Sequence, residues 1–292
     1  MGARVKLFVF GLGYSASHFV RQHGAAFDKT WGTVRAPDRS EADGATLLRF
    51  DGESVDARLS GALASSDALL VSVQPGQGPD PVLEGFATEI AAAGALERIV
   101  YLSTIGVYGD HGGAWIDESA ATVADNPRQA ARIRAEADWL ALGERTGKAV
   151  SVLRLAGIYG PGRNALDDLR AGDARRIDKP GQVFNRIHVT DIGQAIRAAL
   201  DHGAPPRTVN VTDDEPAPAP DVVAYAADLM GVAPPPLVPF ADAELSPMAR
   251  SFYGANRRVR NAVLRQDLGV ALRYPTYRAG LDALWASGEG SA

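Results

Sequence analysis

Two glycines and one alanine near the start of the sequence have the spacing of a phosphate-binding turn. They form the pattern Gly11-x-Gly13-x-x-Ala16 directly after an apolar run. Gly11 permits a tight turn, and Gly13 allows main-chain N–H groups to approach a diphosphate at the positive end of the following helix. Ala16 is the third small residue, required where that helix packs closely on a strand. We therefore predict that a dinucleotide diphosphate binds the loop of Gly11, Leu12, Gly13, Tyr14, Ser15 and Ala16.

The neighbouring residues supply the strand and the helix that this loop requires. Residues 5–10 are nearly all apolar, which is typical of a strand buried on both faces. Ala16, Phe19 and Val20 follow at i, i+3 and i+4 and form the apolar stripe of a helix. The glycine pattern alone is a weak signal, because many strand–helix turns contain two glycines and bind no ligand. Its place between a buried strand and an amphipathic helix favours cofactor binding over a purely structural turn.

Strands and helices alternate through the next part of the chain. Further strands are expected at 31–34, 46–50, 68–73 and 98–102, an amphipathic segment at 55–64 and a helix at 82–93. Parallel strands that are joined by right-handed helical crossovers produce this alternation. The predicted fold class is therefore α/β, with a doubly wound parallel sheet of the Rossmann type.

Three side chains beyond the glycine loop are candidates for cofactor contacts. Arg35 follows the second expected strand, where NAD-binding folds carry an acid for the ribose 2′-hydroxyl. A guanidinium suits a 2′-phosphate, so Arg35 favours NADP over NAD, although a surface arginine would look the same in the sequence. Asp51 follows the third strand and could accept a hydrogen bond from an adenine amine. Gln74 opens a loop rich in glycine and proline at the carboxyl edge of the sheet, where doubly wound folds bind their ligands.

Composition excludes several other classes of function. The 292 residues carry a net charge of −5 and no run of Lys or Arg, so we expect no nucleic-acid partner. The absence of cysteine excludes disulfides, zinc–thiolate sites and thiol catalysis, and is consistent with a cytoplasmic protein. The five histidines form no His-x-x-x-His pair, so no metal site is expected. The first apolar run is too short for a signal sequence or a membrane helix, and we expect no membrane partner.

Three motif runs in the middle of the chain occur in a family-specific order. They are Ser103-Thr104-x-x-Val-Tyr108-Gly, Leu-Arg154-x-x-x-x-Tyr159-Gly-Pro-Gly and Ile-His188-Val-x-Asp. With these runs the chain resembles the extended short-chain dehydrogenase/reductases, the NAD-dependent epimerase/dehydratase family, over nearly its whole length. The resemblance implies a dinucleotide-binding domain of residues 1–163 and 183–211, and a smaller substrate-binding lobe of residues 164–182 and 212–292.

The resemblance also implies a chemistry: hydride transfer between a nicotinamide cofactor and a sugar-like or nucleotide-linked small molecule. Ser103 is then expected beside the cofactor, and Thr104 matches the hydroxyl that positions the substrate oxygen. The family's Tyr-x-x-x-Lys pair, aligned through Ala135-Glu136, falls on Arg128 and Arg132. A guanidinium stays protonated and cannot act as acid and base in turn, so the chain looks like an atypical member.

The altered pair leaves two functional hypotheses. In the first, the protein is an NADP-dependent enzyme, and Tyr159 or water supplies the proton. Arg132 could bond the cofactor ribose, and both Arg128 and Arg132 could bind an anionic group of the substrate. In the second, the protein is a catalytically inactive NADP-binding module that reports redox state to a partner. Members of the family often form two-fold dimers, so a homodimer is possible.

The second half of the chain gives weaker signals. Residues 164–179 are expected to form a mobile insertion over the cleft, and residues 183–189 to return to the sheet. Thr190 or Asp191 is expected to cap the helix that follows. The basic run 257–260 lies where relatives place cations toward a sugar-nucleotide phosphate. A basic turn in solvent would have the same sequence pattern.

Overall fold

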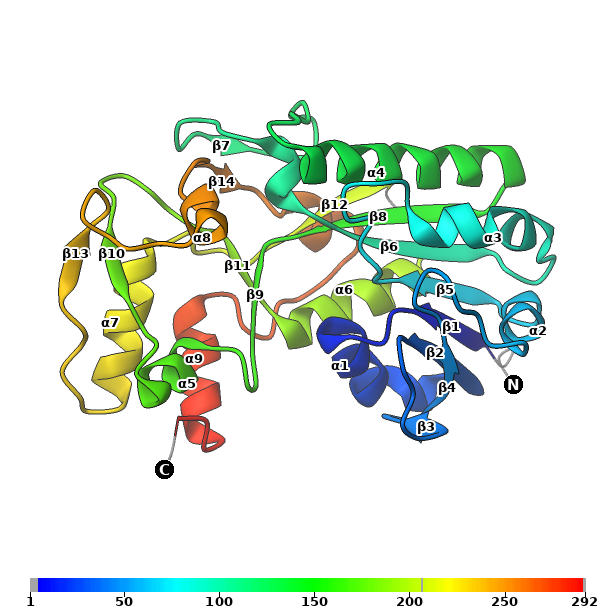
Figure 1. The fold of residues 1–292 in the computed structure, drawn as a ribbon, viewed down its shortest axis with the longest axis horizontal. Coiled ribbons are helices and arrows are strands. Elements are labelled where there is room, and N and C mark those ends of the chain that lie inside the picture. The colour runs from blue at the N-terminus through cyan, green and yellow to red at the C-terminus, as the bar shows by residue number, and fades with distance from the viewer. Residues whose placement is uncertain (1–4, 206, 291–292) are drawn as a thin grey trace.

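The computed structural model describes residues 5–205 and 207–290, and its centre is one eight-stranded sheet (Figure 1). The strand order is β12-β8-β6-β5-β1-β2-β4-β3, and every neighbouring pair is parallel except β3 and β4. The strands are β1 (Lys6–Phe10), β2 (Lys29–Val34), β3 (Glu41–Ala42), β4 (Ala45–Arg49), β5 (Ala68–Val71), β6 (Arg98–Thr104), β8 (Ala149–Leu155) and β12 (Thr208–Val211).

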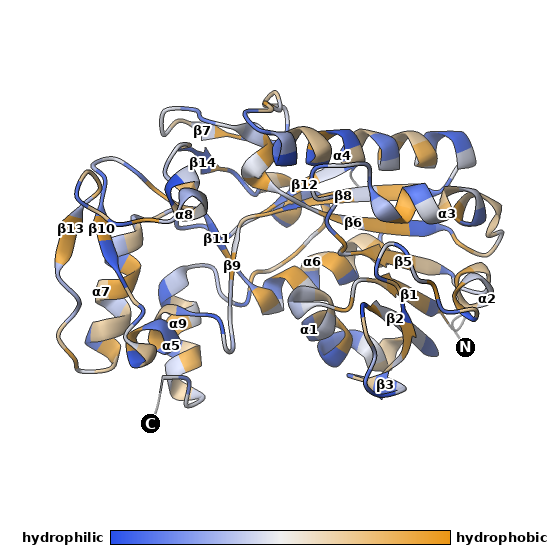
Figure 2. Ribbon diagram, viewed as in Figure 1, coloured by the Kyte–Doolittle hydropathy of each residue, from blue (hydrophilic) through white to orange (hydrophobic). Residues whose placement is uncertain are grey.

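Helices cover both faces of this sheet. One face packs against α1 (Tyr14–His23) and α6 (Val189–Asp201), and the other against α2 (Leu59–Ala64), α3 (Pro81–Ala92) and α4 (Pro127–Thr146). Both faces need cover because apolar side chains along β1 point alternately to the two sides of the sheet. Leu7 and Val9 lie in the core on the α1 side, whereas Phe8 and Phe10 lie in the opposite core. Figure 2 shows the central strands in mostly hydrophobic colours, whereas α4 alternates between hydrophobic and hydrophilic colours. The predicted doubly wound α/β fold is confirmed.

A second, smaller core lies beside the sheet, at the left of Figure 1. It joins Tyr159 and Leu166 to residues of α7 and α9. The elements of this lobe are α5 (Ala165–Ala171), β10 (Arg176–Asp178), α7 (Ala219–Leu229), β13 (Leu237–Pro239), α8 (Pro247–Phe252) and α9 (Tyr277–Ala286). Two short strand pairs, β9 (Gly157–Tyr159) with β11 (Arg186–His188) and β7 (Trp115–Ile116) with β14 (Arg258–Val259), complete the described strands.

The structure corrects two expectations about the route into this lobe. Residues 183–189 do not rejoin the main sheet, because β11 pairs with β9 in a separate two-stranded sheet. Residues 164–179 are not a loose insertion either, since they form α5 and β10. Asn164 caps α5 by accepting from two main-chain amides, and Leu166 is fully buried in the lobe core. Local charge therefore gave no guide to how this segment packs.

The predicted cap of α6 is also wrong. The N-cap residue is His188, whose ring accepts from the Thr190 amide at 3.1 Å. Asp191 lies inside the helix and accepts from the amides of Arg273 and Tyr274. Its carboxylate thus ties α6 to the C-terminal segment. Along the described residues, no helix is long and apolar enough to cross a membrane.

Candidate functional site

A cleft of about 1330 Å³ lies between the carboxyl ends of the central strands and the smaller lobe. It is lined by these residues that the sequence singled out: Gly13, Tyr14, Ser15, Gln74, Ser103, Thr104, Arg128, Arg132 and Tyr159. Five other candidates do not line it: Gly11, Leu12, Ala16, Arg35 and Asp51. The fold therefore brings most of the candidate residues into one cavity.

The glycine loop is held by hydrogen bonds that the sequence did not reveal. The Gly11 amide donates to the Thr33 hydroxyl and the Leu12 amide to the Thr33 carbonyl, both at 2.8 Å. The Gly13 amide donates to the Gly11 carbonyl at 2.8 Å. Gly11 has φ +84° and a Cβ there would lie 2.9 Å from Val73, so this position requires glycine. The amides of Gly11, Leu12 and Gly13 are thus already engaged, and a diphosphate must bind farther along.

The first turn of α1 offers that binding place. Gly13 is the N-cap, and no side chain caps this helix, whereas Asp80 caps α3 and Asn126 caps α4. The amides of Tyr14 and Ser15, which have no side-chain cap among the described residues, therefore stand at the positive end of the helix, and both residues line the cleft. A Cβ on Gly13 would meet no atom within 4 Å among the residues described, so the fold itself leaves room there. This open, uncapped turn fits the diphosphate of a dinucleotide.

Two predicted cofactor contacts lie outside the cleft lining. Arg35 is exposed just after β2. Asp51 accepts from the Arg49 side chain and from the amides of Glu53 and Ser54, and these bonds lower its pKa to about 2. Asp51 thus shapes the turn after β4. Its contact with adenine, and that of Arg35 with a 2′-phosphate, remain predictions.

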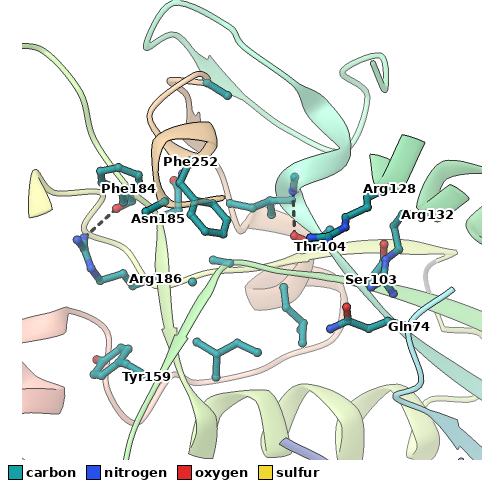
Figure 3. Close-up of a pocket in the computed structure, with 18 of the residues that line it drawn as sticks. Gln74, Ser103, Thr104, Arg128, Arg132, Tyr159, Phe184, Asn185, Arg186 and Phe252 are labelled. Carbon is teal, nitrogen blue, oxygen red and sulfur yellow. Dashed lines mark hydrogen bonds between the residues drawn. The ribbon is translucent and has the colours of Figure 1, made fainter. Parts of the chain in front are cut away.

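Two hydroxyls at the end of β6 face the cleft with opposite hydrogen-bond polarity. Ser103 donates to the Glu136 carboxylate at 2.5 Å, so only its lone pairs remain for a ligand. Thr104 accepts from the Gly106 amide at 3.0 Å, so its own proton is free to donate into the cleft. Figure 3 shows Ser103 and Thr104 on the same side of the cavity as Arg128 and Arg132, with Gln74 below them.

A buried ion pair fixes the hydrogen-bond polarity of Ser103. Glu136 and Arg154 are 4% and 8% exposed, and the guanidinium holds the carboxylate through both Nε and Nη2. Arg154 also donates to the Tyr108 hydroxyl at 2.9 Å, which in turn donates to Asn210. Tyr108 is fully buried behind β6 and is no substitute proton donor.

The cleft has a strongly positive lining in a chain of net charge −5. Its lining contains one carboxylate, Asp173, and the guanidiniums of Arg128, Arg132, Arg163, Arg175, Arg186 and Arg257. Within the described part of the chain, none of the six forms an ion pair with a carboxylate. No group of three or more acidic or histidine side chains in that part could hold a metal ion. Unpaired cations around one cavity indicate anionic ligands.

The comparison with known families agrees with this geometry. A model of the NAD-dependent epimerase/dehydratase family matches residues 87–212, which include Ser103, Thr104, Arg128 and Arg132. Residues 87–212 therefore form a region of the NAD-dependent epimerase/dehydratase family. The matched region contains β6, α4 and β8 and ends just after β12.

Proteins that are similar to this chain carry different functional names. The 3-diazoavenalumate denitrifying reductase of a Streptomyces species is 31% identical over 208 residues, 66% of this chain and 66% of the relative. This chain thus spans just under two thirds of that protein. A conserved protein of unknown function from Silicibacter pomeroyi DSS is 45% identical, with a TM-score of 0.89 over 98% of this chain and 99% of the other.

More distant structures share the fold. A protein from Methylobacillus flagellatus, provisionally described as an NAD-dependent epimerase/dehydratase, is 25% identical with a TM-score of 0.73, over 98% of this chain and 99% of the other. MoeE5, solved with UDP-glucuronic acid and NAD, is 20% identical with a TM-score of 0.74, over 95% and 96% of the two chains. At that identity the likeness concerns the fold alone.

The two arginines at the family's Tyr and Lys positions differ in how they are held. Arg132 donates through Nη1 to the Tyr101 hydroxyl and to the Leu102 carbonyl, both at 3.1 Å. Arg128 is exposed, and Figure 3 shows its side chain extending from α4 toward Thr104. Arg132 is therefore fixed in place, whereas Arg128 is free to contact a ligand.

Tyr159 does not fit the role of substitute proton donor. Its hydroxyl donates to the Thr276 carbonyl at 3.3 Å, and its ring packs edge-on against His188. Burial raises its pKa well above the usual value. Figure 3 shows Tyr159 across the cavity from Thr104, so we exclude it from the proposed chemistry.

Proposed function

We propose that this protein is an NADP-dependent oxidoreductase that acts on a carbonyl or alcohol carbon of a small anionic substrate. The observation that carries the proposal is the set of six guanidiniums around the cleft, none of them ion-paired within the described residues, together with the uncapped N-terminus of α1 that lines the same cleft. The family and the fold neighbour with NAD bound support a nicotinamide cofactor. Arg35 favours NADP, and the absence of cysteine favours the cytoplasm.

Each cleft residue has a distinct part in this chemistry. The amides of Tyr14 and Ser15 would hold the cofactor diphosphate, and Arg132 a ribose hydroxyl. The bound cofactor supplies or accepts the hydride. Thr104 donates a hydrogen bond to the substrate oxygen, and the positive charge of Arg128 stabilises negative charge that develops there. Because neither arginine can exchange a proton, the proton comes from water.

The substrate must carry negative charge and bear an oxidisable or reducible carbon. A nucleotide-linked sugar is one such class, since MoeE5 was solved with UDP-glucuronic acid. The hydrogen-bonding groups of its nucleotide would need partners on the lobe side of the cleft.

Substitution of Thr104 tests the proposal. Purified protein with NADPH is screened against anionic aldehydes and ketones, and cofactor oxidation is followed by absorbance. With the best substrate, Thr104→Val is expected to lower kcat by about a hundredfold, because one positioned donor is lost at the reacting oxygen. NADPH affinity should stay unchanged.

The Ser119→Ala variant is a matched control, since the Ser119 hydroxyl bonds Asp117 in an exposed turn. Equal activity of Thr104→Val and Ser119→Ala would contradict the proposed role of Thr104. Tight NADPH binding without turnover of any substrate would favour the alternative, an inactive NADP-binding module. The observation behind that alternative is the presence of guanidiniums at both positions of the family's catalytic pair.

A further inference from the structure

The lobe side of the cleft is a wall built from two distant segments, residues 182–186 and 252–257. We refer to these two segments as the lobe wall. The Asn185 side chain donates to the Arg257 carbonyl at 3.0 Å and accepts from the Val259 amide at 2.8 Å. Gln182 donates to the Ala255 carbonyl at 2.9 Å. These bonds join the two segments into one surface, opposite Thr104 and Arg128 in Figure 3.

The lobe wall presents aromatic rings to the cleft. Phe184, Phe252 and Tyr253 all line it, and the Phe184 and Tyr253 rings meet edge-on at 5.2 Å. Phe252 is 64% exposed, which is unusual for a large apolar side chain inside a cleft. A planar apolar group of a ligand would cover this ring and remove it from water.

Two half-buried guanidiniums accompany these rings. Arg186 donates to the Phe184 and Ala217 carbonyls, and Arg257 donates to the Gly109 carbonyl. Burial lowers the pKa of both side chains, and neither forms an ion pair within the described residues. The Arg257 Nε is buried and has no acceptor among these residues. A charge in such surroundings is stabilised by an anion that binds it directly.

Hydrogen-bonding groups for a nucleobase are scarce on this surface. The edge of a base needs paired donors and acceptors, but the Asn185 amide already donates to the Arg257 carbonyl and accepts from the Val259 amide. The side-chain groups that remain for a ligand are mainly aromatic rings and guanidiniums, together with the Tyr253 hydroxyl. A ligand with a flat apolar body and one acid group matches this surface better than a nucleotide does.

We propose that the substrate is an aromatic acid, with its ring against Phe252 and Phe184 and its acid group on Arg186 and Arg257. The inference rests on the proposed function, because the same molecule must present its reacting carbon to Thr104. It narrows the substrate class from small anions in general to ring-bearing acids.

Calorimetric titration of the full chain tests this assignment, with and without NADP⁺. The probes are 4-hydroxycinnamate, its uncharged methyl ester, the non-aromatic cyclohexanecarboxylate, and UDP-glucose. We expect 4-hydroxycinnamate to bind at least about tenfold more tightly than each of the other three. Only this probe has both an aromatic ring and a negative charge and carries no nucleobase that needs hydrogen-bond partners. Tighter binding of UDP-glucose would overturn the proposal.

Matched variants locate the contacts. Phe252→Ser should weaken 4-hydroxycinnamate about fivefold, whereas Val232→Ser, at another exposed apolar side chain, should have no effect. Arg257→Gln should weaken it about thirtyfold, and Arg257→Lys, which keeps the charge, should restore part of the loss. Equal binding by Phe252→Ser and Val232→Ser would contradict the ring contact even if Arg257→Gln proved unstable.

The same titrations separate the two proposals. If NADP⁺ binds and 4-hydroxycinnamate does not, the proposed substrate class is wrong and the proposed cofactor stands. If 4-hydroxycinnamate binds with the expected variant pattern and NADP⁺ does not, the lobe wall is assigned correctly and the proposed oxidoreductase function fails.

Discussion

The two walls of the cleft are built in contrasting ways. The cofactor wall comes from a contiguous strand, loop and helix, and it offers main-chain amides at Tyr14 and Ser15. The lobe wall comes from segments about seventy residues apart, as the Asn185–Arg257 bond shows. Its side-chain amides form the hydrogen bonds that join these segments. It offers side-chain charge and aromatic rings instead.

We infer from this difference that one wall provides affinity for the cofactor and the other provides specificity for the substrate. An uncapped helix binds any diphosphate of suitable shape, so the cofactor wall can serve many members of one family. The lobe wall depends on which side chains stand at its surface, and these can change without disturbing the sheet. We therefore expect substitutions on the cofactor wall to affect cofactor binding alone, and those on the lobe wall to affect the substrate or the local fold.

The largest expected effect is that of Gly13→Asp on the cofactor wall. The new carboxylate would stand at the N-cap of α1, where it accepts from the helix amides and repels a diphosphate. NADPH affinity should fall at least about a hundredfold by calorimetry, while the unfolding free energy stays within about 0.5 kcal/mol, because aspartate is a good N-cap.

Gly94→Asp is the control for Gly13→Asp. A Cβ at Gly94 also meets no atom within 4 Å among the described residues, and Gly94 precedes β6, at the edge of the sheet away from the cleft. Its NADPH affinity should match that of the unmodified chain. Full NADPH affinity in Gly13→Asp would contradict the proposed role of the cofactor wall, because the diphosphate would then bind elsewhere.

The next largest effect is on the pH dependence of stability, and it arises from Asp213, which contacts Arg186 of the lobe wall. Asp213 is 1% exposed, and its amide donates to the Arg186 carbonyl. Burial raises the pKa of Asp213 to about 8, against the opposing influence of the Glu215 amide and Arg186. Between pH 4 and 8 the folded state therefore holds a proton that the unfolded state has lost, so stability falls as pH rises.

Asp213→Asn should remove this dependence. From pH 6.5 to 8 the unmodified chain should lose up to about 1.4 kcal/mol of unfolding free energy per pH unit relative to the variant, measured by urea unfolding. His188 does not interfere there: burial lowers its pKa to about 4, so its contribution is lost only as pH falls below 6.5. Parallel curves for the two proteins would show that Asp213 is ionised in the folded state.

The smallest effect is expected at Arg35. Arg35→Ala should weaken NADPH about tenfold and leave NADH unchanged, because only NADPH carries the 2′-phosphate. Arg39→Ala is the comparison, since Arg39 lies nearby but next to Asp38. Equal losses for NADPH and NADH would rule out recognition of the 2′-phosphate by Arg35.

Sequence patterns predicted one wall of the cleft much better than the other. The apolar run before Gly11 and the stripe of Ala16, Phe19 and Val20 led directly to β1 and α1, because local periodicity determines both elements. The role of Thr33 in engaging the loop amides was missed, since strand pairing brings it there from 22 residues away.

The lobe wall had a weaker signal, the basic run 257–260, of which Arg257 lines the cleft. Phe252 and Arg186 are unremarkable in the sequence, and only the joining of two distant segments places both in the cleft. The caps show the same limit. A threonine or an aspartate was the expected cap of α6, but tertiary contacts with Arg273 and Tyr274 engage Asp191, and His188 caps the helix instead.

The most direct test of the account is a crystal structure of the full chain grown with NADP⁺. The account predicts that the diphosphate lies within hydrogen-bond distance of the Tyr14 and Ser15 amides, in the open space before Gly13. A dinucleotide bound elsewhere while this space stays empty would contradict it.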